Sequence, residues 1–428
     1  MSFEMRHPRD QLVGIMSRIY HNGMTTLSGG NLSIKDDNGD MWITPSGVDK
    51  GTLTAKDMMC VQPDGTIIGP HKPSSEYPFH RAIYEQRPDF KAIVHAHPPA
   101  LVTFSIVRQI PDTRIIPQAN RLCGSVGYAP YALPGSVSLG TNIAKTFAEG
   151  HNIVILENHG MVSGGASLLT AFQRLETLDF CARTLIAAKN LGELNTLSDA
   201  ELALFDRGHT VLPEFRRTII TSRERELRQK IVRIVHRAVN RYLMISTEGV
   251  VSARLNGNDF LITPTGQDRG ALSVEDVVLI QNGAREAGKL PSRSVQLHQA
   301  IYEAHSEINC IMTAQCPHAT AYAITASDFN THTIPESYIL LRSIPRIPYQ
   351  MFYSDPKAVA TAVSCKTPVL IIENDGILTV GQDILQTFDR LEVAEYSARS
   401  LIDTTAMGSL VPIAPADIVE LEQAFHLP

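Results

Sequence analysis

The sequence predicts an α/β or α+β protein made of two copies of one domain. Four segments recur in the same order, each 216 to 219 positions further along the chain. The matched pairs are WITPSGVDKGTLTAKD (42–57) with LITPTGQDRGALSVED (261–276), HRAIYE (80–85) with HQAIYE (298–303), IVILENHGMV (153–162) with VLIIENDGIL (369–378), and RLETLDFCARTLI (174–186) with RLEVAEYSARSLI (390–402). We therefore predict a first copy at residues 1–212 and a second copy at residues 213–428, joined near the charged stretch PEFRRTIITSRERE.

Helical and strand patterns interleave within each copy. An amphipathic helix pattern opens the copy, with apolar residues recurring at three and four, as in DQLVGIMSRIYHNG. Short runs rich in Val and Ile follow, separated by Gly, Pro, Asn and Asp, and they predict strands and hairpins. A helix (EYPFHRAIYEQ), a strand (KAIVHAH), a further helix, a strand (NIVILEN) and a long helix at about 167–189 complete the copy. The order lacks the regular alternation of a doubly wound sheet, so the pattern alone leaves α/β and α+β both open.

Composition excludes several classes of protein. The 428 residues are 43% hydrophobic and 19% charged, which is typical of a globular chain, and the net charge of −6 with scattered Lys and Arg predicts no nucleic-acid or membrane partner. The start MSFEMRHPRD lacks the apolar core of a signal peptide, so we expect a cytoplasmic protein. The six cysteines form no C-x-x-C pair and are expected to be reduced. No G-x-G-x-x-G or P-loop motif is present.

A candidate metal site lies at the ends of two predicted strands. His95 and His97 are two residues apart in KAIVHAHPPA, so strand geometry places both imidazoles on one side, and the prolines that follow end the strand. His159, in ENHG, also follows an apolar run and precedes a glycine. Converging imidazoles can hold a divalent metal. Taken alone, each histidine fits an ordinary hydrogen-bonded side chain equally well.

The second copy serves as an internal control for these positions. Its apolar frame is kept, but the three histidines and Glu76 of PSSE have all been replaced, and their counterparts are Thr313, Gln315, Asp375 and Ser294. Histidines that served only the fold would have changed independently of one another. Joint replacement favours a single metal site in the first copy, with Glu76 belonging to it.

Glycines and small polar residues suggest an anion pocket. They lie in GGNLS, TPSG and PSSE, where backbone N–H groups, hydroxyls and a helix N-terminus can hold a phosphate without a lysine. The same residue types also make tight turns, and T-P-[ST]-G persists in the second copy. The composition of this group leaves both interpretations open.

The motifs G-N-x-S, T-P-S-G, P-S-S-E, H-A-H-P and E-N-H-G, in this order, resemble the class II aldolase family of L-fuculose-1-phosphate aldolase and L-ribulose-5-phosphate 4-epimerase. The resemblance covers residues 8–200 and, with the site motifs eroded, residues 226–420. It implies two tandem three-layer α/β/α domains, each with a largely antiparallel central sheet. It also implies a divalent metal, usually zinc, on His95, His97 and His159, and it implies that Glu76 is the catalytic acid/base.

The resemblance carries further expectations about substrate and assembly. It implies a phosphate pocket made by Asn31, Ser46, Gly47, Ser74 and Ser75, and hence a sugar phosphate or related hydroxy-aldehyde substrate. The expected reaction is aldol cleavage through an enediolate. Manganese, iron and cobalt also suit a set of histidine ligands. Relatives resemble C4 tetramers with sites between subunits, so a homodimer of this chain would form a pseudo-tetramer.

Two departures keep other functions open. The family's aldolases have a tyrosine after the HAH strand that helps protonate the departing aldehyde, but IIPQANRLCG contains none; Tyr128 and Tyr131 lie nearby, and the second copy has Tyr338. The other departure is the duplication itself, in which the second copy lacks the site residues. A sugar-phosphate 4-epimerase, a decarboxylase of a phosphorylated sugar acid, and a non-catalytic scaffold resembling the adducin head are therefore the alternatives to an aldolase.

Overall fold

The computed structural model describes residues 3–207 and 211–427, and the chain divides into two compact units. The first unit comprises residues 1–113 and 118–182, and the second comprises residues 114–117 and 183–428. The boundary between sequence copies at 212/213 stays a prediction. Every helix among the described residues is too short or too polar to cross a lipid bilayer.

The described part of the first unit contains one eight-stranded sheet in the order β4-β3-β2-β1-β5-β8-β7-β6. Neighbouring strands are antiparallel except for β6 and β7, which are parallel. The strands are β1 (Asn31–Lys35), β2 (Met41–Ile43), β3 (Met59–Val61), β4 (Ile67–Ile68), β5 (Ala92–Ala96), β6 (Val126–Ala129), β7 (Ile153–Leu156) and β8 (Gly160–Gly165).

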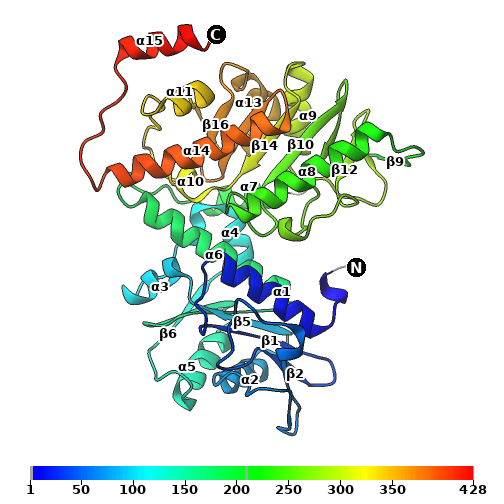
Figure 1. The fold of residues 1–428 in the computed structure, drawn as a ribbon, viewed down its shortest axis with the longest axis vertical. Helices are drawn as coiled ribbons and strands as arrows, with labels where there is room; N and C mark the ends of the chain where they lie inside the picture. The colour runs from blue at the N-terminus through cyan, green and yellow to red at the C-terminus, as the bar shows by residue number, and fades with distance from the viewer. Residues whose placement is uncertain (1–2, 208–210, 428) are drawn as a thin grey trace. The chain divides into compact units, whose positions relative to one another are not determined.

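Helices cover both faces of this sheet (Figure 1). The helices are α1 (Pro8–His21), α2 (Tyr77–Gln86), α3 (Pro99–Ile106), α4 (Pro117–Cys123), α5 (Val137–Ala148) and α6 (Leu168–Ala188). Apolar side chains of α2 and α5 pack on one face, including Phe79, Ile83 and Phe147 against Ile93. On the opposite face, the hydroxyl of Ser163 in β8 donates to the α6 backbone. This confirms the expected three-layer arrangement.

The second unit repeats this topology with one additional edge strand. Its described strands form a nine-stranded sheet in the order β15-β16-β17-β14-β10-β11-β12-β13-β9. The strands are β9 (Glu214–Phe215), β10 (Val250–Asn256), β11 (Asp259–Ile262), β12 (Val278–Gln281), β13 (Ala284–Glu286), β14 (Cys310–Ala314), β15 (Arg346–Ile347), β16 (Val369–Ile372) and β17 (Gly376–Gly381). Apart from β9, the order matches that of the first unit strand for strand.

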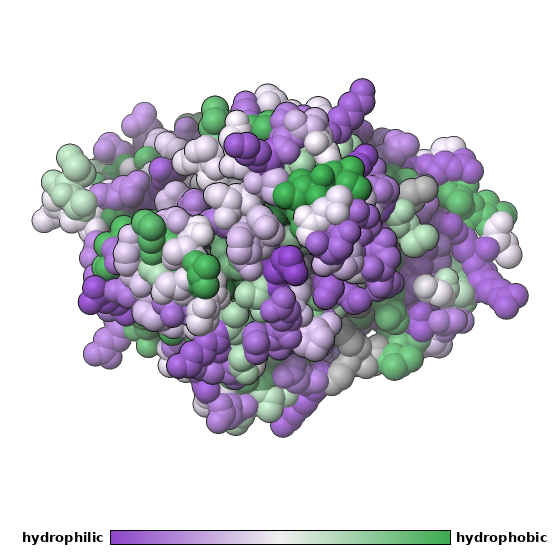
Figure 2. Space-filling model, turned by 90° about the horizontal axis from the view of Figure 1, so that it is seen from below, coloured by the Kyte–Doolittle hydropathy of each residue, from purple (hydrophilic) through white to green (hydrophobic). Residues whose placement is uncertain are grey.

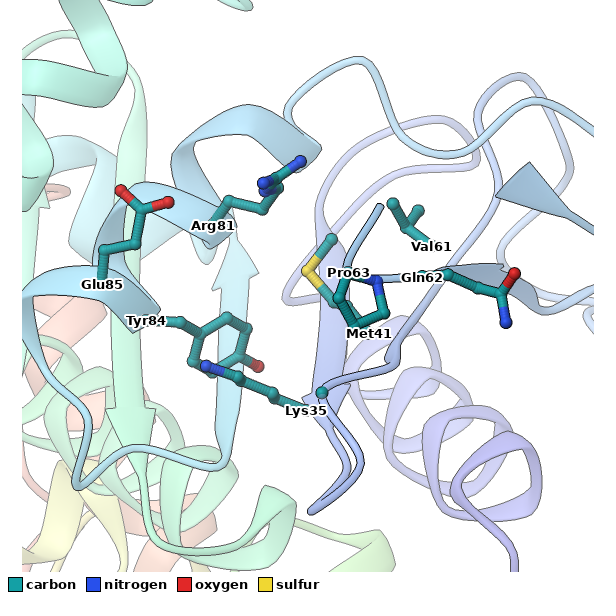
Figure 3. Close-up of a pocket in the computed structure, with 9 residues that line it drawn as sticks. Lys35, Met41, Val61, Gln62, Pro63, Arg81, Tyr84 and Glu85 are labelled. Carbon is teal, nitrogen blue, oxygen red and sulfur yellow. The ribbon is translucent and has the colours of Figure 1, made fainter. Parts of the chain in front are cut away.

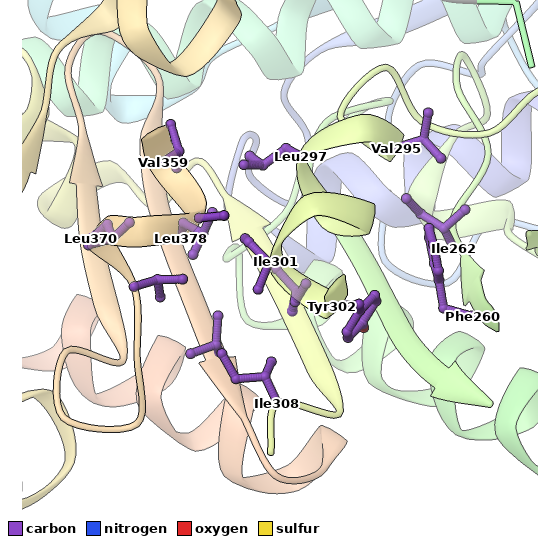
Figure 4. Packing of buried hydrophobic residues seen from close by; sticks show 14 of the residues in the cluster. Phe260, Ile262, Val295, Leu297, Ile301, Tyr302, Ile308, Val359, Leu370 and Leu378 are labelled. Carbon is purple, nitrogen blue, oxygen red and sulfur yellow. The ribbon is translucent and has the colours of Figure 1, made fainter. Parts of the chain in front are cut away.

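The helices of the second unit again lie on both faces of the sheet. They are α7 (Asp199–Asp206), α8 (Ser222–Asn240), α9 (Val295–Ala304), α10 (Pro317–Ala323), α11 (Pro335–Leu341), α12 (Tyr349–Ser354), α13 (Pro356–Ala362), α14 (Ile384–Thr404) and α15 (Pro415–Ala424). Leu297 and Ile301 of α9 and Val359 of α13 pack against Leu370 and Leu378 of the sheet (Figure 4). Burying such side chains contributes roughly 1.5–3 kcal/mol each.

The molecular surface is largely polar on the face shown in Figure 2, where hydrophobic side chains form small separate groups. This agrees with the moderate net charge and the scattered ionic residues of the sequence.

Candidate metal centre

The ends of β5 and β7 bring the three predicted histidines together. His95 lies in β5 and His97 directly follows it, while His159 lies in the turn between β7 and β8. Antiparallel pairing places Ala96 opposite Met161, so the end of β5 lies beside the start of β8 and the turn that carries His159. One ring nitrogen from each histidine lies within 4.8 Å of the others, and the Nε2 atoms of His95 and His97 are 3.0 Å apart.

The surroundings of these imidazoles favour the uncharged form, which is the form that binds a metal ion. Burial, followed by the neighbouring imidazoles, lowers the pKa of His95 and of His97 to about 3. Burial also lowers the pKa of His159. The Nδ1–H of His95 donates to the carbonyl of Met161 at 2.8 Å, which leaves the Nε2 lone pair directed at the cluster. A divalent metal that suits nitrogen ligands therefore fits these residues.

Two glycines leave the space that His97 occupies. A Cβ atom on Gly160 would lie 2.6 Å from the His97 ring and 2.7 Å from the carbonyl oxygen of Ala96. A Cβ atom on Gly29 would lie 2.9 Å from Nδ1 of His97. Real Cβ atoms do not approach this closely, so side chains at either position would displace the histidine. The second copy has Glu248 where the first has Gly29.

Glu76 lies against the histidine cluster. It caps α2 and is 9% exposed, and its Oε2 atom is 3.3 Å from Nε2 of His95. Its Oε1 atom is 3.8 Å from Nε2 of His159. The Nδ2 group of Asn31 donates to Oε2 at 2.8 Å. The carboxylate can therefore meet a substrate held at the cluster.

The predicted anion-binding residues lie on two adjacent loops beside Glu76. Ser74 N–H donates to Thr44 O at 3.2 Å, and Ser46 N–H donates to Lys72 O at 2.9 Å, so the TPSG and PSSE loops lie side by side. The side chains of Ser46 and Ser75 are exposed and Gly47 has a φ of +70°, whereas Ser74 is buried. The pairing joins both loops but leaves their outer edge open for a ligand.

Sequence reasoning missed Lys50, which supports this loop pair. Lys50 is 3% exposed, and its Nζ group donates to the carbonyl of Pro45 at 2.6 Å. Burial lowers the pKa of Lys50 to about 8. It lies inside the first repeated segment, and its counterpart Arg269 is also buried and also donates to backbone carbonyls. The signal available in the sequence was that both copies have a cationic residue at this position of the repeated segment.

The equivalent positions of the second copy bind one another. Nε2 of Gln315 donates to Oδ1 of Asp375 at 2.6 Å, and the Tyr353 hydroxyl donates to Oδ2 at 2.7 Å. Val250 pairs with Thr313 in the same register as Asn31 with His95. Polar side chains thus bind one another where the first copy gathers imidazoles, although Oε1 of Gln315 finds no partner among the described residues. Among the described residues, the histidine cluster of the first copy is the only group of three or more His, Cys, Asp or Glu side chains that could hold a metal ion.

Helix α7 packs against the second-copy residue that stands at the position of Ser75. The guanidinium of Arg293, at the position of Ser75, lies 3.5 Å from the centroid of the Phe205 ring and donates to the Phe205 carbonyl at 3.2 Å. The ring of Phe205 also contacts that of Tyr353. The second site is therefore closed by side chains of its own unit.

The tyrosines considered as proton donors to a departing aldehyde are occupied elsewhere or exposed. The hydroxyl of Tyr338 donates to Glu422 at 2.5 Å, and that of Tyr128 donates to the Ser105 carbonyl at 3.3 Å. Tyr131 is 57% exposed.

Comparison with known proteins shows the family of this chain. The family model described as Class II Aldolase and Adducin N-terminal domain matches residues 10–186 and again residues 229–402, so the chain belongs to this family. The two matches correspond to the two sequence copies.

Individual relatives each cover less than half of the chain. A 3-oxo-tetronate 4-phosphate decarboxylase of Pectobacterium atrosepticum is 35% identical over 188 residues, which are 43% of this chain and 85% of the relative. A 5-deoxy-D-ribulose 1-phosphate aldolase of Bacillus thuringiensis is 30% identical over 46% of this chain and 93% of its own length. An L-fuculose phosphate aldolase of Methanococcus maripaludis is 30% identical over 42% and 97%. A solved L-fuculose 1-phosphate aldolase is 32% identical over 48% and 97%, with a TM-score of 0.43.

Proposed function

We propose that the first copy is a metal-dependent lyase that acts on a sugar phosphate through an enediolate. The observation that carries the proposal is the convergence of three neutral imidazoles beside a buried carboxylate. We assign His95, His97 and His159 as metal ligands and Glu76 as the acid/base. Zinc is the metal we expect first, and manganese, iron and cobalt suit the same ligands.

The histidines, the loop residues and Glu76 would have separate roles in the reaction. A divalent metal bound by the three histidines would act as a Lewis acid on the carbonyl and hydroxyl oxygens of the substrate. Asn31 and the TPSG and PSSE loops, with Ser46, Gly47, Ser74 and Ser75, would hold the phosphate and fix the substrate beside Glu76. Glu76 would move the proton to or from carbon.

The bond changes balance without a further reactant. In aldol cleavage Glu76 would accept the proton of the substrate hydroxyl, the C–C bond would break to release an aldehyde, and the electron pair of that bond would enter the enediolate. Glu76 then protonates the carbon and the ketone forms. The counterpart residues of the second copy cannot perform these steps, so we expect one active site per chain.

Decarboxylation of a phosphorylated sugar acid is the second candidate, because a 3-oxo-tetronate 4-phosphate decarboxylase is 35% identical to this chain over 188 residues. Loss of carbon dioxide generates the same kind of enediolate, which Glu76 would protonate in the same way. Epimerisation uses related chemistry. Product analysis separates these reactions, since cleavage releases an aldehyde and decarboxylation releases carbon dioxide.

The first experiment measures metal per chain by mass spectrometry, on the native chain, on His97→Ala and on the matched control Gln315→Ala in the second copy. We expect about one metal in the native chain and in Gln315→Ala, and almost none in His97→Ala. Phosphorylated ketoses and 3-oxo acids would then be tested for aldehyde and carbon dioxide. Absence of metal from the native chain, even after incubation with zinc or manganese, would contradict the lyase and leave an adducin-like scaffold.

We further propose that the chain forms a homodimer, in which four aldolase-like domains make a pseudo-tetramer with two active sites. A monomer in size-exclusion chromatography with light scattering would contradict this assembly.

A further inference from the structure

We propose that His80 is a positioning residue that holds Glu76 through Asn31. The role in catalysis rests on the proposed lyase function, whereas the geometry stands by itself. Nε2 of His80 lies 2.5 Å from Oδ1 of Asn31, and Nδ2 of Asn31 lies 2.8 Å from Oε2 of Glu76. All three residues are at most 9% exposed, and His80 is fully buried.

The hydrogen bonds continue behind His80. Its Nδ1 lies 2.7 Å from the Ser33 hydroxyl, which lies 2.8 Å from the hydroxyl of Tyr84. Tyr84 lines a hollow of about 230 Å³ between α2 and the β-hairpins, next to Lys35 and Arg81 (Figure 3). An unbroken series of hydrogen bonds therefore runs from the wall of this hollow to Glu76.

The chemistry of the groups gives the series one direction. A carboxylate can only accept, so the amide of Asn31 presents Nδ2 to Glu76 and Oδ1 to His80. His80 must then donate from Nε2, which leaves Nδ1 to accept from Ser33, and Ser33 accepts from Tyr84. Such a series requires a neutral imidazole, and burial lowers the pKa of His80 to about 3. The hydrogen bond from His80 thus holds the Asn31 amide in the orientation that presents Nδ2 to Glu76.

Comparison with the second copy distinguishes the residues that serve the fold from those that would position Glu76. Its Ser252, His298 and Tyr302 repeat the inner hydrogen bonds at 2.7 Å each. Val250 stands where Asn31 does, and Nε2 of His298 finds no hydrogen-bond partner among the described residues. The serine, histidine and tyrosine are therefore compatible with the fold alone. The link through an asparagine to a glutamate is present only in the copy with the intact histidine cluster.

The test compares His80→Phe with its matched control His298→Phe in the full-length, metal-loaded chain. Each variant keeps a planar ring and removes both nitrogens. His80→Phe breaks two hydrogen bonds and His298→Phe breaks one, so His80→Phe should lose more thermal stability. We expect His80→Phe to retain about one metal and to lower kcat at least tenfold with KM within twofold of native. We expect His298→Phe to leave kcat unchanged. His80→Gln, which can donate and accept, should recover part of kcat and replaces His80→Phe if that variant does not fold.

A structural readout distinguishes failure of this proposal from failure of the lyase function. In crystal structures, the distance from Nδ2 of Asn31 to Oε2 of Glu76 should stay near 2.8 Å in the native chain and exceed about 3.5 Å in His80→Phe. An unchanged distance in His80→Phe, or an equal fall of kcat in His298→Phe, would overturn the positioning role. Displacement of Glu76 in a chain that converts no sugar phosphate would retain the positioning role and reject the lyase.

Discussion

Exchanging Asn31 and Val250 between the two copies should change the stability of the two units in opposite directions. Asn31→Val removes the acceptor of the buried His80 Nε2–H and the donor to Glu76. An orphaned buried donor costs roughly 1–3 kcal/mol and a hydrogen bond to a charged group contributes about 1.5–3 kcal/mol. The apolar valine returns about 1.5 kcal/mol, so we expect a net loss of about 2–4 kcal/mol in the first unit.

Val250→Asn makes the reverse change. It offers an acceptor to the orphaned Nε2–H of His298, and the amide can also meet the Ser294 hydroxyl at the position of Glu76. The gain of roughly 1–3 kcal/mol is partly offset because Val250 is a partly buried residue that packs on the core of the second unit. We expect a net stabilisation of about 1 kcal/mol.

The single tryptophan allows the units to be followed separately. Trp42 lies in β2 of the first unit, so its fluorescence reports the unfolding of that unit, while far-ultraviolet circular dichroism reports both. In urea with a chelator present, and with a slope of about 2 kcal/mol/M, Asn31→Val should lower the midpoint of the tryptophan transition by about 1–2 M. An unchanged midpoint, or a lower stability of the second unit in Val250→Asn, would refute the reasoning from the orphaned donor.

Two further predictions use the same probes. The free energy of unfolding of the metal-free first unit should fall faster than that of the second unit as the pH falls from about 6.5 towards 3. Each buried histidine with a pKa near 3 takes up a proton on unfolding, which lowers the free energy of unfolding by about 1.4 kcal/mol per pH unit. Burial lowers the pKa of His298 in the second unit to about 3. In the first unit it does the same for three histidines, His80, His95 and His97. Equal acid dependence of the tryptophan and dichroism transitions between pH 6 and 4 would contradict this. Phe205→Ala should destabilise the second unit by about 3 kcal/mol, because it removes a buried ring that contacts Arg293 and Tyr353. The midpoint of the tryptophan transition, which reports the first unit, should stay unchanged. A shift of that midpoint would contradict the assignment of α7 to the second unit.

Local sequence patterns predicted the duplication and the histidine cluster, whereas the three-layer arrangement was implied by the resemblance to a family. The repeat showed that one topology occurs twice, and the structure has the same strand order in both units. The two-residue spacing of His95 and His97 at a strand end predicted that their imidazoles share one side. ENHG also follows an apolar run that predicts a strand, and this position made His159 the candidate third ligand.

Longer-range contacts could not be predicted in this way. His80 lies in a repeated segment, but its partners Ser33 and Asn31 are 47 and 49 positions away, and only the pairing of β1 with β5 brings Asn31 to the site. Likewise, α7 precedes the predicted join at 212/213, yet Phe205 packs against side chains of the second unit. Periodicity describes which face of an element is apolar, but it carries no information on which distant polar groups meet.

The position of the site in the fold explains how one copy could lose it and remain folded. The metal-like cluster lies at strand ends, while the main apolar cluster of the second unit comes from residues farther along the same strands and from α9 and α13. Replacing imidazoles at strand ends therefore removes no apolar contact from that core. Each new polar group then needs only a local partner, which Asp375 finds in Gln315 and Tyr353. Two unpaired buried atoms remain at these positions among the described residues: Oε1 of Gln315, which stands where His97 does, and Nε2 of His298, which kept its place after Asn31 was replaced.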